Sequence, residues 1–149
     1  MIGLLQRVSS ASVVIGGETI GSIDAGLLVL AAVQRGDGPA EAARLAQRLL
    51  NYRVFPDENG RMNLSLREHG GGIMLVPQFT LAANTRKGTR ASFARAANPD
   101  LGSILFKKLV AEVRALHEPV AAGVFGADMQ VALVNDGPVT FWLDTGKAA

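Results

Sequence analysis

Short runs of hydrophobic residues alternate with turn-forming residues through the first part of the chain. Three runs have strand length, and the residues between them are typical of hairpin turns: residues 1–8, 11–16 and 18–23, separated by Ser9-Ser10 and Gly16-Gly17. A fourth run, GLLVLAAV at 26–33, is apolar throughout, as expected for a buried strand. The pattern therefore predicts a sheet built from several short strands.

Two later segments combine helix-start residues with apolar positions spaced three and four apart. Asp37-Gly38-Pro39 supplies a capping residue and a proline for the first turn of a helix. The apolar face that follows consists of Ala42, Leu45, Ala46 and Leu49. Asn98-Pro99 opens a second predicted helix in the same way, with apolar residues on one side at Leu101, Leu105, Leu109 and Leu116.

Further apolar runs in the second half predict the remaining strands. IMLVPQFTL at 73–81 follows three glycines, and segments 128–136 and 138–143 are separated only by Gly137. The order strands, helix, strand, helix, strands predicts an α/β fold with a mixed sheet and two main helices. A length of 149 residues fits a single compact domain, residues 1–149.

Composition narrows the classes of function. Hydrophobic residues make up 48% of the chain and charged residues 19%, which is ordinary for a globular protein. The absence of cysteine excludes disulfide scaffolds, thiolate zinc sites and cysteine nucleophiles. The N-terminus lacks the basic region of a signal peptide, and no apolar run approaches the roughly 20 residues of a membrane span. We therefore expect a soluble, cytoplasmic protein without a membrane partner.

The charge is small overall but unevenly distributed. Fifteen Lys and Arg against 13 Asp and Glu give a net charge of +2. Between His69 and Pro99 there is no acidic residue, whereas four cations lie there: Arg86, Lys87, Arg90 and Arg95. Such a stretch is typical of a loop that faces phosphates, although a solvated surface loop has the same pattern.

Conventional catalytic machinery is missing. The chain has two histidines, His69 and His117, and neither lies in a catalytic or metal-binding motif. Two polar segments are nevertheless unusual. Residues 77–80 end an otherwise apolar strand, where Gln78 and Thr80 would share one face, which is either a solvent face or a binding site. Residues 135–140 form either an ordinary hairpin turn or a turn with a cis Gly-Pro bond.

Long stretches of the chain resemble the D-aminoacyl-tRNA deacylase family. The matching segments are MIGLLQRV at 1–8, GLLVL at 26–30, FPDENGRMNLS at 55–65, QFTLAANTRKG at 78–88 and ADMQVALVNDGPVTFWL at 127–143. The resemblance implies a fold like that family's, with the mixed sheet forming a partial barrel. It also implies hydrolysis of the ester bond of D-aminoacyl-tRNA and of mischarged glycyl-tRNA, in translation quality control.

The resemblance further implies a homodimer with active sites at the subunit interface. Gly137 and Pro138 would form a Gly-cisPro motif that enters the partner's pocket and excludes L-amino acids by main-chain contact. Main-chain groups at Gln78, Phe79 and Thr80 would hold the aminoacyl group. Arg7 would brace the Gly-Pro segment.

Other roles implied by the resemblance concern the tRNA. Arg86, Lys87 and Arg90 would bind its aminoacylated 3′ end, and Met129 with Phe125 would line an adenine pocket or else belong to the core. No metal, cofactor or DNA partner is expected. Hydrolysis would use either Thr80 as nucleophile or, as we favour, the terminal 2′-OH of the tRNA, because no base adjoins Thr80 in the sequence.

One departure from the family pattern opens two alternatives. The family's usual Ser-Gln-Phe-Thr-Leu begins with Pro77 here, which removes a hydroxyl and an N–H group. In the first alternative, the loss of these groups abolishes catalysis, and the chain is a non-catalytic tRNA-binding relative disabled by Pro77. The other alternative is a hydrolase of small esters that uses Thr80 as its nucleophile.

Overall fold

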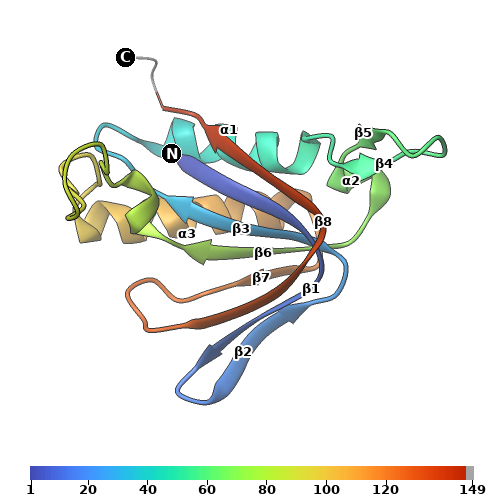
Figure 1. The fold of residues 1–149 in the computed structure, drawn as a ribbon, viewed down its shortest axis with the longest axis horizontal. Coiled ribbons are helices and arrows are strands. Elements are labelled where there is room, and N and C mark those ends of the chain that lie inside the picture. Colours follow the sequence, from blue (N-terminus) through green and yellow to red (C-terminus); the bar gives the residue numbers. More distant parts are fainter. Residues whose placement is uncertain (147–149) are drawn as a thin grey trace.

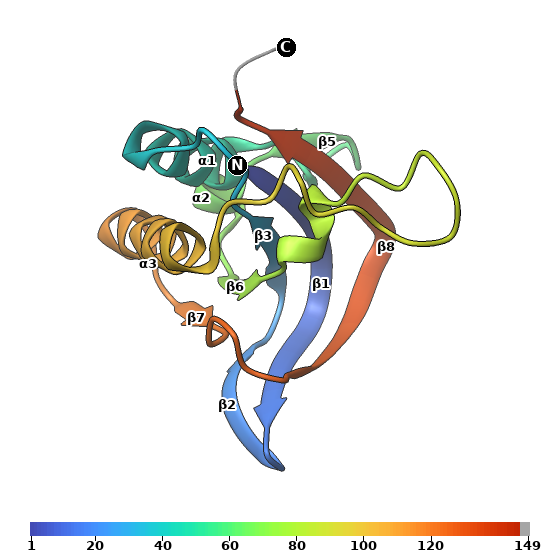
Figure 2. The ribbon, with the colours of Figure 1, turned by 90° about the vertical axis from the view of Figure 1, so that its left-hand side faces the viewer.

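A curved, mixed sheet of six strands carries two long helices on one of its faces (Figures 1 and 2). The computed structural model describes residues 1–146. The elements in chain order are β1 (Ile2–Ile15), β2 (Glu18–Ile23), β3 (Gly26–Ala32), α1 (Pro39–Asn51), β4 (Phe55–Pro56), β5 (Met62–Leu64), α2 (Leu66–His69), β6 (Gly72–Pro77), the 3₁₀ turn η1 (Phe79–Ala82), α3 (Pro99–Leu116), β7 (Val120–Ala122) and β8 (Gln130–Asp144). The predicted α/β class is confirmed, and α2 is an additional short helix.

The long strand β1 organises the sheet. Strand β8 pairs antiparallel with β1 along one edge, while β3 and β2 pair with the first and second halves of its other edge. Strands β6 and β7 extend the sheet in parallel from β3. The sheet curls until a Cβ built on Gly21 of β2 would lie 3.4 Å from the Cβ of Ala121 in β7. The sheet is therefore nearly closed, as the implied partial barrel requires.

Two predicted breaks between strands are wrong. Ser9 and Ser10 lie inside β1, where the pairing with β8 shifts register between Val8 and Ser10. Similarly, residues 128–136 and 138–143 do not form two separate strands, because β8 continues through Gly137. In both places, pairing between distant segments keeps the backbone extended, and a local bulge absorbs residues that favour turns.

Helix α1 forms where predicted, but a different residue caps it. Gly38 is the N-cap, and its N–H donates to Glu41 Oε2 at 2.7 Å. The Asp37 carboxylate instead accepts from the Gln34 N–H at 2.7 Å and contacts the Met1 ammonium at 2.8 Å. The predicted apolar face is buried throughout at Ala42, Leu45, Ala46 and Leu49.

Helix α3 begins at the predicted cap and lies beside α1. The Asn98 Oδ1 accepts from the Leu101 N–H at 2.9 Å, which satisfies one of the free donors of the first turn. Leu105 and Leu109 are buried, whereas Leu116, in the last turn of the helix, is exposed. No helix in residues 1–146 is long and apolar enough to cross a membrane.

Apolar residues pack on both faces of the sheet. One cluster joins β3 and β6 to the two long helices, and it includes Leu27, Leu75, Leu45 and Leu109. A second cluster fills the concave side, with Val8, Leu28, Met74 and Val76 at its centre. Burial on both faces explains the continuous apolar runs of β3 and β6. The buried run of β6 ends at Pro77, which is half-buried, so the chain leaves the core at this residue.

Candidate active site

Strand β6 delivers the first unusual segment to the edge of the concave side. The strand ends at Pro77, which has no N–H to continue the pairing, and the Gln78 N–H donates to the Ala31 carbonyl oxygen at 2.8 Å. The chain then turns into η1, so the prediction of one strand over 73–81 is wrong. Gln78 and Thr80 still lie together, because the Gln78 amide donates to the Thr80 hydroxyl across the turn.

A cavity of about 530 Å³ opens beside this turn. Pro77, Gln78 and Phe79 line one wall, and residues 125–129, which include Met129, line the other. The walls meet tightly at Gly123, where an added Cβ would lie 2.8 Å from the Met129 Sδ and 3.2 Å from the Pro77 Cδ. The structure thus brings five residues named in the sequence analysis to one cavity: Pro77, Gln78 and Phe79, and, about 50 positions later in the chain, Phe125 and Met129. Thr80 adjoins the cavity through Gln78 without lining it.

The chemistry available at this cavity is that of main-chain groups. The N–H groups of Phe79 and Thr80 open the 3₁₀ turn, and the first N–H groups of a helical turn have no acceptor within it. Of the described residues that line the cavity, Asp128 alone is charged and none is a histidine. This arrangement can hold a carbonyl or an anionic oxygen, but it offers no imidazole base.

Both histidines are engaged elsewhere. The His69 ring stacks on Phe55 with its centroid 4.2 Å away, and His117 Nε2 lies 2.7 Å from the Gly71 carbonyl oxygen. No group of three or more potential metal ligands occurs within residues 1–146. Both histidine side chains therefore make packing or hydrogen-bond contacts away from the cavity, which agrees with the lack of a catalytic motif around them.

The second unusual segment lies on β8, exposed and outside this cavity. The Gly137–Pro138 peptide bond is cis, as the resemblance implies. The Asn135 side chain spans the segment: its Oδ1 accepts from the Val139 N–H at 2.7 Å, and its Nδ2 donates to the Val139 carbonyl oxygen at 3.1 Å. The same Nδ2 also lies 3.2 Å from the Gln6 Oε1. An added Cβ on Gly137 would lie 2.6 Å from the Val139 nitrogen, so only glycine fits there.

Arg7 supports the same segment from the neighbouring strand. Its Nε donates to the Asp136 carbonyl oxygen at 2.8 Å, and its Nη1 donates to the Val54 carbonyl oxygen at 2.7 Å. The Arg7 side chain is only 15% exposed. These contacts are of the kind that a bracing residue needs. Asn135 was not predicted as a site residue, although an amide side chain two residues before a Gly-Pro step is a recognisable turn signal.

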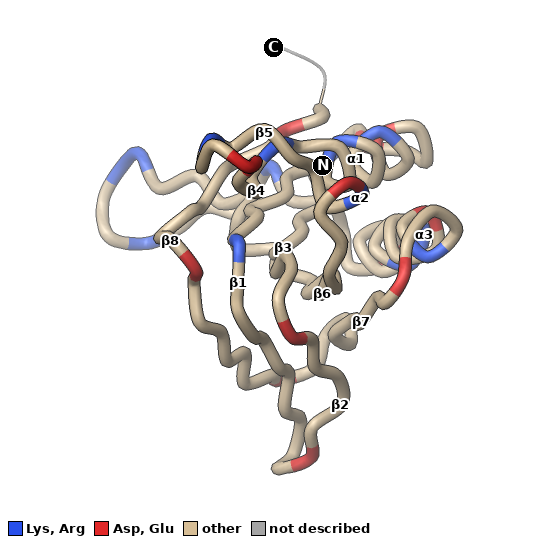
Figure 3. The backbone as a smooth tube through the Cα atoms, turned by 90° about the vertical axis from the view of Figure 1, so that its right-hand side faces the viewer, with Lys and Arg blue, Asp and Glu red and all other residues tan. Residues whose placement is uncertain are grey.

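The predicted basic residues lie on a projecting loop (Figures 2 and 3). The backbone of Asn84 pairs with that of Ser92 at the base of the loop, with N···O distances of 2.7 and 3.0 Å. Arg86, Lys87 and Arg90 are exposed, and no ion pair within the described residues involves them. Their charge is thus available to solvent or to an anionic partner.

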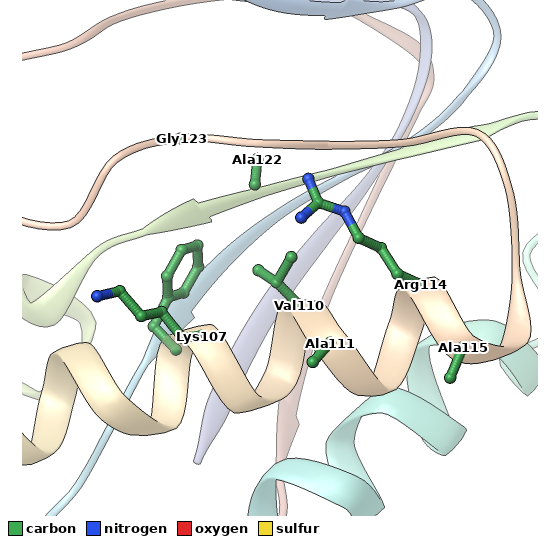
Figure 4. A pocket seen from close by; sticks show the side chains of 8 residues that line it. Lys107, Val110, Ala111, Arg114, Ala115, Ala122 and Gly123 are labelled. Carbon is green, nitrogen blue, oxygen red and sulfur yellow. The ribbon is translucent and has the colours of Figure 1, made fainter.

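A separate groove of about 700 Å³ lies between α3 and β7 (Figure 4). Lys107, Val110 and Arg114 line it from α3, and Ala122 faces them from β7. It contains none of the predicted site residues. The cavity at Pro77, Gln78 and Phe79 is therefore the one that the sequence and the structure mark together.

Comparison with known proteins places this architecture among related chains. A family model described as D-Tyr-tRNA(Tyr) deacylase matches residues 4–144. The D-aminoacyl-tRNA deacylase of Thioalkalivibrio sulfidiphilus (strain HL-EbGR7) is 64% identical over 144 residues, which cover 97% of each chain. That of Alkalilimnicola ehrlichii (strain ATCC BAA-1101 / DSM 17681 / MLHE-1) is 58% identical over 149 residues, covering 100% of this chain and 99% of the relative.

Two solved structures are also similar. One, named c-Myc DNA Unwinding Element Binding Protein, is 35% identical with a TM-score of 0.91, and the match covers 97% of this chain and 98% of the other. The second is described as a probable eukaryotic D-amino acid tRNA deacylase. It is 18% identical with a TM-score of 0.78, covers 95% of this chain and 97% of its own, and shows a common fold.

Proposed function

The chain belongs to the D-Tyr-tRNA(Tyr) deacylase family, and we infer that it is a D-aminoacyl-tRNA deacylase, a carboxylic ester hydrolase. Water adds to the ester carbonyl, the bond from the acyl carbon to the ribose oxygen breaks, and a D-amino acid and tRNA leave. Relatives that bear this name match the chain nearly end to end. Residues 1–149 act as one domain, a view supported by Met1 and Leu143 lying in the same core cluster.

The proposed mechanism is based on the groups that line the cavity. Gln78, Phe79 and Thr80 hold the aminoacyl group through main-chain N–H groups, which stabilise the negative oxygen that forms as water adds. An aminoacyl ester is activated enough that such donors and correct positioning lower the barrier sufficiently. Support comes from the exposed start of the 3₁₀ turn and from the absence of histidine among the described lining residues.

The terminal 2′-OH of the tRNA, rather than Thr80, assists the attacking water. A serine- or threonine-type nucleophile needs an adjacent base that removes its proton. The partner of the Thr80 hydroxyl is the side-chain amide of Gln78, which has no basic nitrogen. Thr80 therefore acts by orienting Gln78 and the substrate.

Main-chain atoms of Gly137 and Pro138 exclude L-amino acids. An editing enzyme that accepts any D side chain has to recognise the configuration of the α-carbon, and a rigid wall does so by steric exclusion. Glycine has no side chain to be excluded, so mischarged glycyl-tRNA is also hydrolysed. The bracing of this segment by Asn135 and Arg7 supports such a role, because a movable wall would discriminate poorly.

The functional unit is a homodimer in which the Gly-cisPro motif of each subunit reaches the cavity of the other. The motif is exposed and lies outside the cavity of its own chain, so a second subunit is needed to bring the two together. The same strand exposes Val134 and Trp142 to the extent of 57% and 52%. Apolar side chains of this size on an edge strand are suited to burial against a partner.

The nucleic-acid partner is the aminoacylated 3′ end of tRNA, bound by Arg86, Lys87 and Arg90. Their exposure and lack of an ion pair within the described residues support this role. One solved relative is named for a DNA element, but the reaction proposed here needs a ribose with a 2′-OH, so duplex DNA is not a substrate. The enzyme works in the cytoplasm, where aminoacylated tRNA is used. Neither a metal nor a cofactor takes part.

The deciding experiment compares hydrolysis of D-Tyr-tRNA and L-Tyr-tRNA by the purified protein in EDTA. We expect rapid loss of the D ester alone. This result would also show that Pro77 is compatible with catalysis and that no metal is needed.

Two other outcomes would contradict the proposal. If neither ester is hydrolysed while tRNA still binds, the chain is the non-catalytic tRNA-binding relative. Equal hydrolysis of both esters would contradict main-chain discrimination and favour the general ester hydrolase that uses Thr80.

A further inference from the structure

A second cavity shares a wall with the candidate active site. It has a volume of about 540 Å³, and Phe79, Ala97 and Pro99 line both cavities. Its other side is formed by Arg35 and Phe93. The Phe79 side chain therefore stands between the site that holds the ester and a neighbouring space of similar size.

Two phenylalanine rings are exposed at this boundary. Phe79 is 54% and Phe93 is 44% exposed, and their ring centroids lie 5.2 Å apart at an interplanar angle of 53°. Single exposed apolar residues are common, but a contacting pair of exposed rings in a cavity is typical of an interaction site. Unpaired nucleotides bind proteins by stacking their bases on such rings, largely independently of base identity.

Charge favours RNA over a second apolar partner. Arg35 is exposed and is the one charged residue among the described residues that line this cavity. The backbone N–H of Arg35 donates to the Arg95 carbonyl oxygen at 2.9 Å, which ties this side of the cavity to the segment that carries Phe93. Phe93 directly follows Ser92, which closes the base of the basic loop. A polyanion that leaves the site past Phe79 would thus meet cations on its way.

We propose that this second cavity binds the unpaired nucleotide that precedes the terminal adenosine of the tRNA. Its base stacks on Phe93 at the edge of Phe79, and its phosphate contacts Arg35. The proposal rests on the deacylase function, because the terminal adenosine with its ester occupies the neighbouring cavity. It assigns to Phe93 and Arg35 a role in substrate binding and none in the chemical step.

The test compares two substrates that differ in this nucleotide. D-Tyr-tRNA carries it, whereas adenosine esterified with D-Tyr at its 3′-OH ends before it. We expect Phe93→Leu to raise KM for D-Tyr-tRNA about tenfold with unchanged kcat, since stacking on one ring contributes about 5- to 150-fold in affinity. Hydrolysis of the adenosine ester should not change. Phe93→Trp should restore the KM for D-Tyr-tRNA.

Arg35→Gln gives an independent readout of the phosphate contact. We expect KM for D-Tyr-tRNA to rise and its dependence on salt to weaken, because one cation–phosphate contact is lost. Ile104→Ala, which truncates an exposed side chain on α3, is the matched surface control and should leave the hydrolysis of both substrates unchanged.

Several results would overturn the proposal. One is an unchanged KM for D-Tyr-tRNA in Phe93→Leu. Another is a loss of hydrolysis in this variant that is equally large for D-Tyr-tRNA and for the adenosine ester. A third is a shift from dimer to monomer in sedimentation, which would make the rings a subunit contact.

Direct binding separates this proposal from the deacylase function. The trinucleotide CCA should bind the wild-type protein more tightly than adenosine does, and Phe93→Leu should remove the difference. This measurement needs no turnover, so it decides on the cavity even if the protein hydrolyses neither ester. Equal binding of CCA to both proteins would overturn the proposal.

Discussion

The turn after β6 leaves its first N–H groups without partners in the turn, whereas side-chain hydrogen bonds fix the Gly137–Pro138 segment of β8. In the turn, Phe79 and Thr80 are exposed at the rim of a cavity, and the first N–H groups have no acceptor within the turn. In β8, the Asn135 side chain spans residues 135–139, and the Arg7 side chain donates to the carbonyl oxygen of Asp136 within this segment. The difference suggests a division of labour: donors that receive a substrate have to be free, whereas a wall that excludes one enantiomer has to be rigid.

The largest expected effect comes from breaking the rigid segment. Gly137→Ala would place a Cβ 2.6 Å from the Val139 nitrogen, so the backbone of the segment has to move. We expect kcat/KM for D-Tyr-tRNA to fall at least about 100-fold, because misplacement by about 1 Å has costs of that size. Single-turnover hydrolysis measures the loss.

Gly38→Ala is a suitable control for Gly137→Ala. The added Cβ would meet Glu41 Oε2 at 3.5 Å, an ordinary contact, and activity should be retained. A Gly137→Ala protein with normal activity would show that the segment does not shape the site.

A smaller effect is expected when the brace is removed and the glycine is kept. Asn135→Ala leaves the N–H and carbonyl of Val139 without their side-chain partner. We expect the free energy of unfolding to fall by about 2 kcal/mol, at about 1 kcal/mol per hydrogen bond. Hydrolysis of L-Tyr-tRNA should rise relative to D-Tyr-tRNA as the wall loosens.

Urea unfolding and the ratio of D to L hydrolysis measure the two parts of the Asn135→Ala prediction. Asn135→Asp keeps the acceptor for the Val139 N–H and should be intermediate. Lower stability with unchanged selectivity would separate the brace from discrimination.

The next prediction concerns the charges of the projecting basic loop. Replacing Arg86, Lys87 and Arg90 together by Gln should raise KM for D-Tyr-tRNA about tenfold or more, with little change in kcat. The slope of log KM against log salt should decrease by about 2–3, since each phosphate contact contributes about 0.7–0.9. Lys107→Gln in the α3 groove is the control. An unchanged salt dependence would place the RNA elsewhere.

A modest effect is expected at the hydroxyl of the open turn. Thr80→Val removes the acceptor of the Gln78 amide, and hydrolysis of D-Tyr-tRNA should slow only about fivefold, the cost of one hydrogen bond. A substrate with a 2′-deoxy terminal adenosine and a 3′ ester should react at least about 100-fold more slowly with the wild-type protein. Complete loss of activity in Thr80→Val would identify Thr80 as the nucleophile.

The smallest effect concerns the hairpin β4–β5, which directly follows Val54, the second carbonyl partner of Arg7. The side chain of Asn63 and the N–H groups of Arg61 and Asn59 hold the pKa of Asp57 below its ordinary value of 3.8. The ionised form is the bonded one, so its stabilising contribution is complete above about pH 3.8 and is lost as the pH falls through the lowered pKa.

An NMR titration of Asp57 measures this pKa. Asn63→Ala should return it toward 3.8, while the cross-peaks of residues 135–139 stay unchanged at neutral pH. A pKa that does not move in Asn63→Ala would assign the shift to the backbone donors instead.

Much of the site was predictable because local signals coincide there. The Pro77–Thr80 stretch is polar where an apolar run ends, and the Gly-Pro step follows an Asn-Asp pair. The shape of the turn was not predictable, because two-residue periodicity continues past Pro77 although the chain turns at Gln78. Asn135 was missed because its bonds to Val139 depend on the local shape of the Gly-Pro segment, and its contact with Gln6 depends on β8 lying beside β1.

The sequence alone determined the class of fold, the two long helices, the buried strands β3 and β6, and the two polar segments proposed for the site. These follow from local periodicity, from capping residues and from the distribution of charge. The tertiary structure decided that Ser9 and Ser10 continue a strand, that Gly137 lies within β8, and that Phe79 separates two cavities. Each of these depends on contacts between segments far apart in the chain, whose pairing energy exceeds local turn preference.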